Sequence, residues 1–268
     1  MNILNKIWNE DCIKTMQRMT NGSVNLIATS PPYNIGKEYE KSQSIDFYIG
    51  WIKSLLPEFY RVLADDGSIC FQVGNYVKNG AVYPIDCLLF NSFLSVGFIP
   101  RNRIIWHFGH GLHCKKRFSG RHETILWFTK SNNYKFNLDP IRVPSKYPNK
   151  KHYKGDKKGE LSGNPLGKNP SDVWDITNVK NNHPEKTDHP CQFPERLIER
   201  LVLSLTNKHD VVYDPFMGSG TTGKVSHLQN RNYIGSEISA EYVDIANQRI
   251  QENRIRLESL AQLNQKSA

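Results

Sequence analysis

The sequence predicts an α/β fold built on a mostly parallel sheet, and two observations support this. Segments with the character of buried strands alternate with segments whose apolar residues recur at helical spacing. Two short loops, Thr29-Ser-Pro-Pro-Tyr33 and Asp214-Pro-Phe-Met-Gly-Ser-Gly220, each follow a predicted strand. Ligands of open α/β sheets bind where strands end and loops begin, so we expect both loops at one binding site.

The first predicted elements lie between residues 24 and 73. Residues 24–28 are expected to form a buried strand. Residues 47–63 carry apolar side chains at helical spacing, and Pro57 is expected to kink or divide this helix. A turn at residues 65–67 then leads into a strand at residues 68–73.

Strands are also predicted at residues 103–108 and 124–128, after which the character of the chain changes. Residues 138–186 are rich in lysine, proline and glycine and show no regular period, so we expect an irregular insert that is functional or partly disordered. Regular structure resumes with a helix opened by Pro194, a strand at 211–213, a helix at 221–229, a strand at 232–236 and an amphipathic helix from about Ala240.

Positive charge is concentrated in the middle of the chain. The 268 residues carry a net charge of +9, but residues 101–168 alone hold 16 lysines and arginines against 4 acidic residues. A basic block of this kind is typical of a protein that binds a polyanion, because released counterions then contribute affinity. A solvated lysine-rich loop is the alternative, and the two loops described above favour nucleic acid.

The five cysteines are odd in number and form no C-x-x-C pair, which argues against a disulfide framework and against a zinc site. The spacing of His107, His110 and His113 suggests a metal cluster, but no acidic residue accompanies them, so we predict no metal. The sequence has no signal-peptide pattern and no apolar run that would span a bilayer. We therefore expect a soluble cytoplasmic protein without membrane contact.

The glycine loop predicts a nucleoside cofactor that carries no phosphate. Gly218 and Gly220 allow the backbone to approach a ligand closely. The loop lacks the lysine of a phosphate-binding loop and the three-glycine spacing of a dinucleotide fingerprint. Glu237 ends the next predicted strand, where an acid is suited to bind the hydroxyls of a ribose. S-adenosylmethionine fits this description.

The Ser30-Pro-Pro-Tyr33 loop has the groups needed to activate an exocyclic amine of a nucleobase. The amine's lone pair is delocalised into the ring, and two hydrogen-bond acceptors localise it on the nitrogen. The Ser30 hydroxyl and the Pro31 carbonyl are candidates for these acceptors, and Pro32 helps to fix the backbone. Tyr33 offers a ring on which an extruded base can stack.

On these motifs the chain resembles the exocyclic-amino DNA methyltransferases, the N6-adenine and N4-cytosine group, over nearly its full length. The catalytic motif precedes the cofactor motif, an order similar to that of the β subclass, which has a circularly permuted, Rossmann-like methyltransferase fold. The resemblance implies the cofactor S-adenosylmethionine and double-stranded DNA as substrate. It is compatible with a homodimer and with a separate cognate restriction endonuclease.

The resemblance also implies roles for further residues. Residues 189–194 resemble the motif that lines the methionine end of the cofactor, residues 9–12 the acidic motif beside its adenine, and residues 121–123 the motif that flanks the pocket of the flipped base. The predicted cofactor-binding residues are Asp11, Asp214, Phe216, Gly218, Gly220, Thr222, Glu237, His189, Pro190 and Gln192. The predicted DNA-binding residues are Lys115, Lys116, Arg117, Arg121, Lys151 and Lys154.

Three parts of the chain follow from this assignment: residues 1–137 are the catalytic part of the methyltransferase domain, 138–186 a basic target-recognition insert, and 187–268 the cofactor-binding part.

Because family members with serine in the first motif position are mostly N4-cytosine enzymes, we predict N4 of cytosine, with N6 of adenine as the alternative. An amino-methyltransferase of RNA or of protein glutamine, and a silent DNA-binding module, are more remote. Pro190-Cys191-Gln192 resembles the nucleophile site of C5 methyltransferases, but it precedes the glycine loop here.

Overall fold

The computed structural model describes residues 2–32, 43–111, 113–180 and 182–252. Its centre is a sheet of eight strands in the order β1-β10-β9-β2-β3-β7-β6-β8. These strands are β1 (Lys6–Trp8), β2 (Val24–Thr29), β3 (Leu63–Val73), β6 (Ile99–His107), β7 (His122–Thr129), β8 (Val173–Asp175), β9 (Val211–Asp214) and β10 (Asn232–Ser236). Only β7 pairs antiparallel with its neighbours, so the predicted mostly parallel sheet is confirmed.

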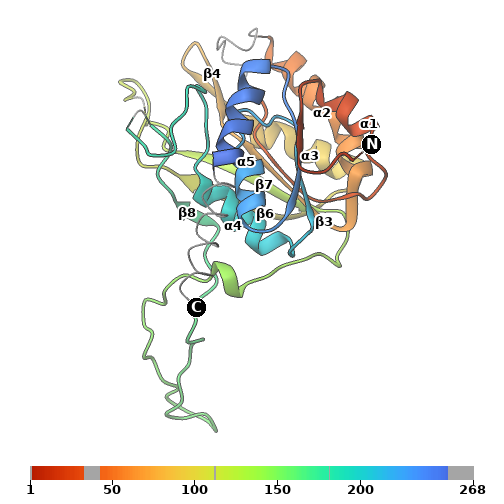
Figure 1. Ribbon diagram of the computed structural model, residues 1–268. Coiled ribbons are helices and arrows are strands. Elements are labelled where there is room, and N and C mark those ends of the chain that lie inside the picture. Colours follow the sequence, from red (N-terminus) through yellow and green to blue (C-terminus); the bar gives the residue numbers. More distant parts are fainter. Residues whose placement is uncertain (1, 33–42, 112, 181, 253–268) are drawn as a thin grey trace.

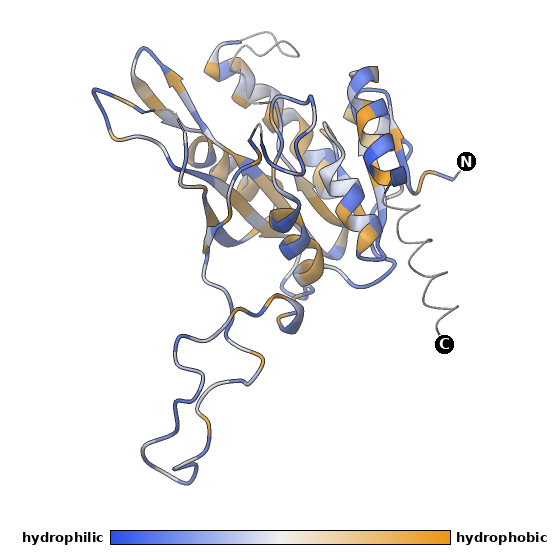
Figure 2. Cartoon of the chain, turned by 60° about the vertical axis from the view of Figure 1, so that its left-hand side comes forward, coloured by the Kyte–Doolittle hydropathy of each residue, from blue (hydrophilic) through white to orange (hydrophobic). Residues whose placement is uncertain are grey.

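Helices cover both faces of this sheet (Figure 1). One face packs against α1 (Cys12–Gln17), α2 (Ile45–Val62) and α3 (Ile85–Val96), and the other against α4 (Glu195–Leu205) and α5 (Thr221–Leu228). Alternate residues of β2 enter the two cores, Ile27 on the first side and Leu26 with Ala28 on the second. In Figure 2 the strands at the centre are coloured mostly as hydrophobic, whereas the helices carry both hydrophobic and hydrophilic residues.

Two local predictions differ from the structure in detail. Pro57 lies inside α2, which is one undivided helix; the residue is exposed, so water can satisfy the carbonyl that loses its partner. The turn expected at residues 65–67 lies within β3 as an irregularity, because the pairing of β3 with β2 jumps from Leu63 to Ser68. β3 therefore starts earlier than the predicted strand.

Several elements have no counterpart among the sequence predictions. They are β1, α1, α3, β8 and a separate hairpin of β4 (Asn75–Lys78) and β5 (Ala81–Pro84). α3 has a recognisable end signal in Gly97, which caps it with a left-handed φ of 107°. The structure also shows helix from residue 240 to residue 252, where the description ends.

The predicted insert is irregular apart from a short 3₁₀ helix, η1 (Asp139–Ile141), and β8, which joins the sheet beside β6. Residues 143–168, called the arm below, project from the core and are held as a loose pair of strands by bridges such as Val143–Lys168. The arm extends beyond one end of the sheet, and the β4–β5 hairpin lies at the other (Figure 1). No helix in the described part of the chain has both the length and the apolar character needed to cross a membrane.

Candidate active site

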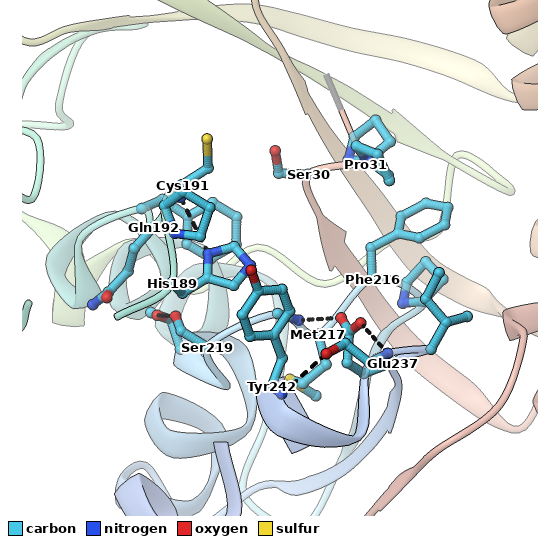
Figure 3. A pocket seen from close by; sticks show the side chains of 18 of the residues that line it. Ser30, Pro31, His189, Cys191, Gln192, Phe216, Met217, Ser219, Glu237 and Tyr242 are labelled. Atoms are coloured by element: carbon cyan, nitrogen blue, oxygen red, sulfur yellow. Dashed lines mark hydrogen bonds between the residues drawn. The ribbon is translucent and has the colours of Figure 1, made fainter. Parts of the chain in front are cut away.

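The two predicted loops meet in one pocket. β2 and β9 are neighbouring parallel strands in the middle of the sheet, and their carboxyl ends lead into residues 30–32 and 215–220. The next helices, α2 and α5, pack on opposite faces of the sheet, which leaves a crevice between the two loops. A cavity of about 750 Å³ occupies this position (Figure 3).

Ser30, Pro31 and Pro32 line this cavity. Pro31 is buried and Ser30 half-buried. Figure 3 shows Ser30 and Pro31 across the pocket from His189. Tyr33, the fourth residue of the predicted catalytic motif, lies outside the described residues.

Asp214 connects the two loops through hydrogen bonds of its buried carboxylate. It is 1% exposed and accepts hydrogen bonds from Thr29 Oγ1 (2.6 Å), Thr222 Oγ1 (2.7 Å) and the Phe216 backbone N–H (3.1 Å). Burial raises the pKa of Asp214 to about 6, although the three donors favour the carboxylate. Asp214 and Thr222 do not line the pocket, so they position the loops that do.

The two glycines of the loop have different surroundings. Gly218 has φ 49° and lines the pocket, and a Cβ there would lie 3.0 Å from His189 Nε2. Gly220 has φ 81° and faces the C-terminal helix, where a Cβ would meet the Cβ of Ala246 at 2.6 Å. Gly218 therefore keeps space at the pocket wall, whereas Gly220 allows the helix to pack closely.

Glu237 faces the pocket from the end of β10, as predicted from its position after the strand. Its carboxylate accepts hydrogen bonds from the backbone N–H groups of Gly218 and Ser239, both at 2.9 Å, and burial raises its pKa. Phe216 lies beside it on the pocket wall (Figure 3). Asp11 also lines the pocket, and its side chain caps α1 by accepting from Ile13 N–H at 2.8 Å.

His189 forms the opposite wall as a neutral side chain. Burial lowers its pKa to about 4, and nearby Lys186 adds to this effect. Its Nδ1 accepts a hydrogen bond from Cys191 N–H (3.2 Å), and its ring meets the Tyr242 ring edge-on at 4.4 Å. The uncharged imidazole, held by this hydrogen bond and by the edge-on contact with Tyr242, forms a fixed wall of the pocket.

Pro190 and Gln192 line the pocket next to His189. The Gln192 amide is fixed on both sides, since it donates to Glu185 O (2.7 Å) and accepts from Thr187 Oγ1 (3.0 Å). All three residues of this predicted motif therefore reach the pocket.

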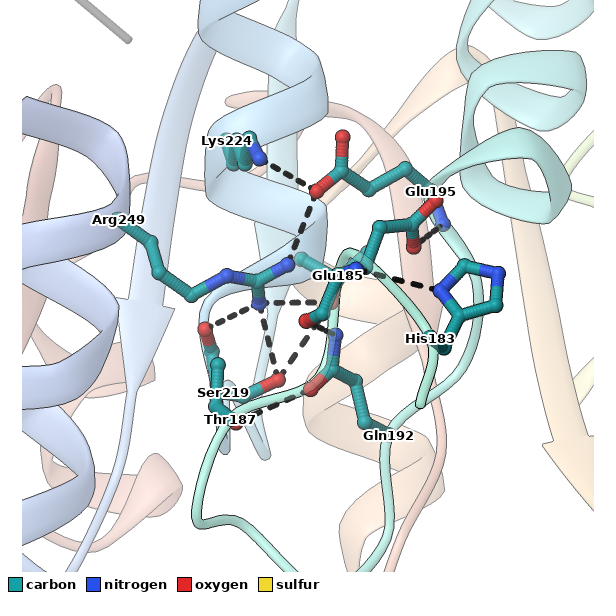
Figure 4. A network of polar contacts seen from close by, with 9 residues as sticks. His183, Glu185, Thr187, Gln192, Glu195, Ser219, Lys224 and Arg249 are labelled. Carbon is teal, nitrogen blue, oxygen red and sulfur yellow. Dashed lines mark hydrogen bonds and ion pairs between the residues drawn. The ribbon is translucent and has the colours of Figure 1, made fainter. Parts of the chain in front are cut away.

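A buried ion network behind the glycine loop was not predicted. Arg249 donates to Ser219 O (2.6 Å) and to the Glu195 carboxylate (3.0 Å), which also binds Lys224 (2.5 Å) (Figure 4). The network links the C-terminal helix, α4 and α5 to the loop, so it fixes the loop's position. Its members lie far apart in sequence, and no local sequence pattern predicts that they pair.

A second group of residues, here called the base half, extends the pocket across β3, β7 and β6. The buried Gln72 donates its side-chain N–H to the Glu123 carboxylate. Glu123 lines the pocket together with Trp106 and Phe108. Glu123 belongs to the predicted flanking motif, whereas Gln72, Trp106 and Phe108 were not predicted as site residues; Trp106 is buried.

The predicted DNA-binding cations fall in two separate places. Lys115, Lys116, Arg117 and Arg121 lie between β6 and β7, whereas Lys151 and Lys154 lie on the arm. None of the six lines the pocket. His107, from the predicted histidine series, pairs with Asp175 at 2.5 Å, and the described residues hold no cluster suited to a metal ion.

The pocket itself is acidic. Its described lining contains no lysine or arginine, and its carboxylates are Glu10, Asp11, Glu123, Glu237 and Glu241. Such a lining disfavours a ligand that carries phosphate and favours a cationic or neutral one.

Comparison with known proteins identifies the family. The model of a family described as DNA methylase, of N6- and N4-methyltransferases, matches residues 24–248. The chain is 56% identical over 246 residues to the Type II methyltransferase M.BglII of Bacillus subtilis, a match that covers 91% of this chain and 68% of that protein. It is 32% identical over 245 residues to the DNA adenine methyltransferase YhdJ of Escherichia coli (strain K12), covering 90% and 80% respectively.

Solved structures show the same fold. The cytosine-N4-specific PvuII DNA methyltransferase superposes with a TM-score of 0.72 at 23% identity, covering 91% of this chain and 85% of that one. TTHA0409 of Thermus thermophilus, a structure in complex with S-adenosyl-L-methionine, gives 0.65 at 24% identity, covering 92% and 95%. The chain therefore belongs to the N6/N4 DNA methylase family, which confirms the fold class and the DNA-methyltransferase function predicted from the sequence.

Proposed function

We propose that the pocket binds S-adenosylmethionine and a base turned out of double-stranded DNA, and that the enzyme methylates N4 of cytosine. One observation carries this proposal: Ser30 and Pro31 line the same cavity as Gly218 and Glu237. The hydrogen bond of 2.6 Å between Thr29 and Asp214 holds the two loops together.

The cofactor half fits S-adenosylmethionine. The acidic lining without cations suits a cofactor that has a sulfonium and an ammonium but no phosphate. Glu237 is placed to accept hydrogen bonds from ribose hydroxyls, and Phe216 with Ile238 offers apolar surface for the adenine. When bound, this cofactor supplies an electrophilic methyl group.

The catalytic loop would activate the amine of the base. The Ser30 hydroxyl and the Pro31 carbonyl accept its two N–H groups, which localises the lone pair on nitrogen. We extend the proposal to Tyr33 as a stacking surface for the base. The proposed transfer needs no covalent enzyme intermediate.

Glu123 is proposed as the acceptor of the proton that the amine must lose. The amine lone pair would form the new N–C bond as the bond between the methyl group and the cofactor's sulfur breaks, which leaves S-adenosylhomocysteine. The nitrogen would become positively charged, and one N–H proton would then leave to restore a neutral amine. Thr29 pairs with Phe71 across β2 and β3, and Ser30 and Gln72 are the next residues of the two chains. Gln72 donates to Glu123, and Ser30 and Glu123 line the same cavity. A carboxylate is a far better proton acceptor than a hydroxyl or a carbonyl.

The choice of cytosine rests on Ser30 as the first motif residue. N6 of adenine is the alternative, since one relative, YhdJ, is named an adenine methyltransferase. We also retain the division into residues 1–137, 138–186 and 187–268, with target recognition in the middle part. A cytoplasmic location, a homodimer and a separate restriction endonuclease complete the proposal.

Methylation of unmethylated genomic DNA with labelled S-adenosylmethionine, followed by nucleoside mass spectrometry, tests the function. We expect N4-methylcytosine from the wild type, a large loss in Ser30→Ala, and normal product from Ser95→Ala, which removes an exposed hydroxyl from α3. N6-methyladenine would select the alternative base. No product on DNA, despite cofactor binding, would contradict the proposal and favour RNA, protein or a silent binder. Sequencing the product gives the recognition site.

A further inference from the structure

A loop on the rim of the pocket carries an unusual side chain. Residues 108–121, called the rim loop below, connect β6 and β7, and its ends are joined by a hydrogen bond from Phe108 N–H to Arg121 O (3.0 Å). Phe108 lines the pocket, as does Glu123 just beyond the loop. The loop therefore starts and ends at the wall of the base half, at the opposite end of the sheet from the arm (Figure 1).

Phe118 is fully exposed on this loop. Its side chain has 100% of its accessible surface in water, more than any other large hydrophobic residue that the structure describes. The Cys114 N–H donates to Ser119 Oγ (3.0 Å), which closes the backbone around residues 114–119. A phenyl ring in this place gains no burial energy on folding, so its apolar surface is available to a partner.

The charges around Phe118 indicate which partner. Lys115, Lys116 and Arg117 directly precede it and are all exposed, and the sequence of residues 108–121 contains no acid. Cations that surround an apolar tip match phosphates on either side of stacked bases. A hydrophobic protein partner would gain nothing from three adjacent cations.

We propose that Phe118 is a wedge that enters the base stack of duplex DNA next to the target base, while Lys115, Lys116 and Arg117 contact the flanking phosphates. The proposal rests on the proposed function, because a base must leave the stack to reach Ser30. Extrusion loses stacking energy, and an inserted apolar side chain replaces part of it. The rim loop begins at the wall of the receiving pocket, which is where such a wedge is needed.

The test compares Phe118→Ala, Phe118→Trp and Leu94→Ala. Leu94 is 40% exposed on α3, outside the parts of the chain assigned to DNA or to the pocket, and serves as the control. The substrates are a duplex with the recognition site and the same duplex with the target base mispaired. Each duplex carries the fluorescent base 2-aminopurine beside the target base. The fluorescence of 2-aminopurine rises when its stacking on the target base is lost.

For Phe118→Ala we expect a loss of about 10- to 100-fold in kcat/KM on the paired duplex, the range of one lost base–aromatic stack, and a smaller fluorescence rise. On the mispaired duplex the loss shrinks, because that base leaves the stack at lower cost. Phe118→Trp restores both signals, and Leu94→Ala behaves as wild type.

Two outcomes would overturn the wedge and leave the proposed function intact: wild-type kinetics in Phe118→Ala, or an equal loss on both duplexes. A wild type that binds S-adenosylmethionine but methylates neither duplex would refute the proposed function, and the wedge with it. Cofactor affinity, unchanged in all three variants, confirms that each is folded.

Discussion

The two halves of the pocket are built in different ways. On the cofactor side, Gly218, Glu237 and His189 lie in or beside short motifs, and backbone hydrogen bonds fix them. In the base half, Gln72 and Glu123 come from separate strands and meet only because β3 pairs with β7. A side made from contiguous loops can be located from sequence, whereas a side made by strand pairing needs the fold.

Gly218→Asp gives the sharpest test of the cofactor half. A side chain at φ 49° is strained, and its Cβ would lie 3.0 Å from the His189 ring, so the loop or the ring must move. Strain and overpacking together cost about 4 kcal/mol, which corresponds to roughly a thousandfold loss of cofactor affinity.

Isothermal titration with S-adenosylmethionine measures this loss. Gly163→Asp is the control, because a Cβ at Gly163 meets nothing within 4 Å. Full cofactor binding by the Gly218 variant would show that the loop does not touch the ligand.

His189 predicts a pH dependence of stability on the same side. Its pKa is lowered to about 4 in the folded protein from 6.5, so the unfolded chain takes up a proton first as the pH falls. Stability is lost between pH 6.5 and pH 4, by about 3 kcal/mol from this residue alone. The raised pKa of Asp214, about 6, acts in the opposite direction over part of that range.

Urea unfolding of the wild type and of His189→Asn gives the unfolding free energy of each protein. Their difference isolates the contribution of His189 to the pH dependence of stability, since Asp214 is present in both. We expect the difference in unfolding free energy to shrink or change sign as the pH is lowered from 7 to 4. His110→Asn, at an exposed histidine, supplies the control. A difference that does not vary with pH would show that His189 titrates normally.

Glu123→Gln tests the base half. The amide keeps the shape of the side chain and can still accept the hydrogen bond from Gln72, but it is not a proton acceptor. We expect kcat to fall by about 100-fold, the lower end of general-base effects, while affinity for S-adenosylmethionine stays normal. A rise of kcat with pH in the wild type should also be absent from the Glu123→Gln variant.

Steady-state and single-turnover kinetics separate the chemical step from product release. Asp244→Asn, at an exposed position of the C-terminal helix that does not line the pocket, is the control. Unchanged single-turnover rates in Glu123→Gln would assign the proton to water and leave Glu123 a packing role.

The same contrast explains what could be predicted from the sequence. The central strands β2 and β9 were located because each is a short, mostly apolar run that ends in a recognisable loop. The strand at 232–236 was located because it follows the glycine loop and its helix and ends at Glu237. α3 and the Arg249–Glu195 contact were not predicted. α3 has an end signal in Gly97 but no side-chain cap at its start, and Arg249 and Glu195 are 54 residues apart. Glycine positions in the loop were predicted, but only the structure separates Gly218 in the pocket from Gly220 against Ala246.

The two basic segments were also indistinguishable by composition, although the structure places them at opposite ends of the sheet. If DNA lies over the pocket, Lys115→Ala/Lys116→Ala should lower the slope of log affinity against log salt by about 2, since each lost phosphate contact contributes about 0.9. The arm variant Lys151→Ala/Lys154→Ala should lower the slope much less and weaken binding about twofold at low salt, through the loss of long-range attraction alone. Fluorescence anisotropy over a salt series measures the affinity and the slope for both variants. An equal change of slope in the two variants would mean that the arm also contacts DNA phosphates. A duplex that lies only on the rim of the pocket would not reach the arm.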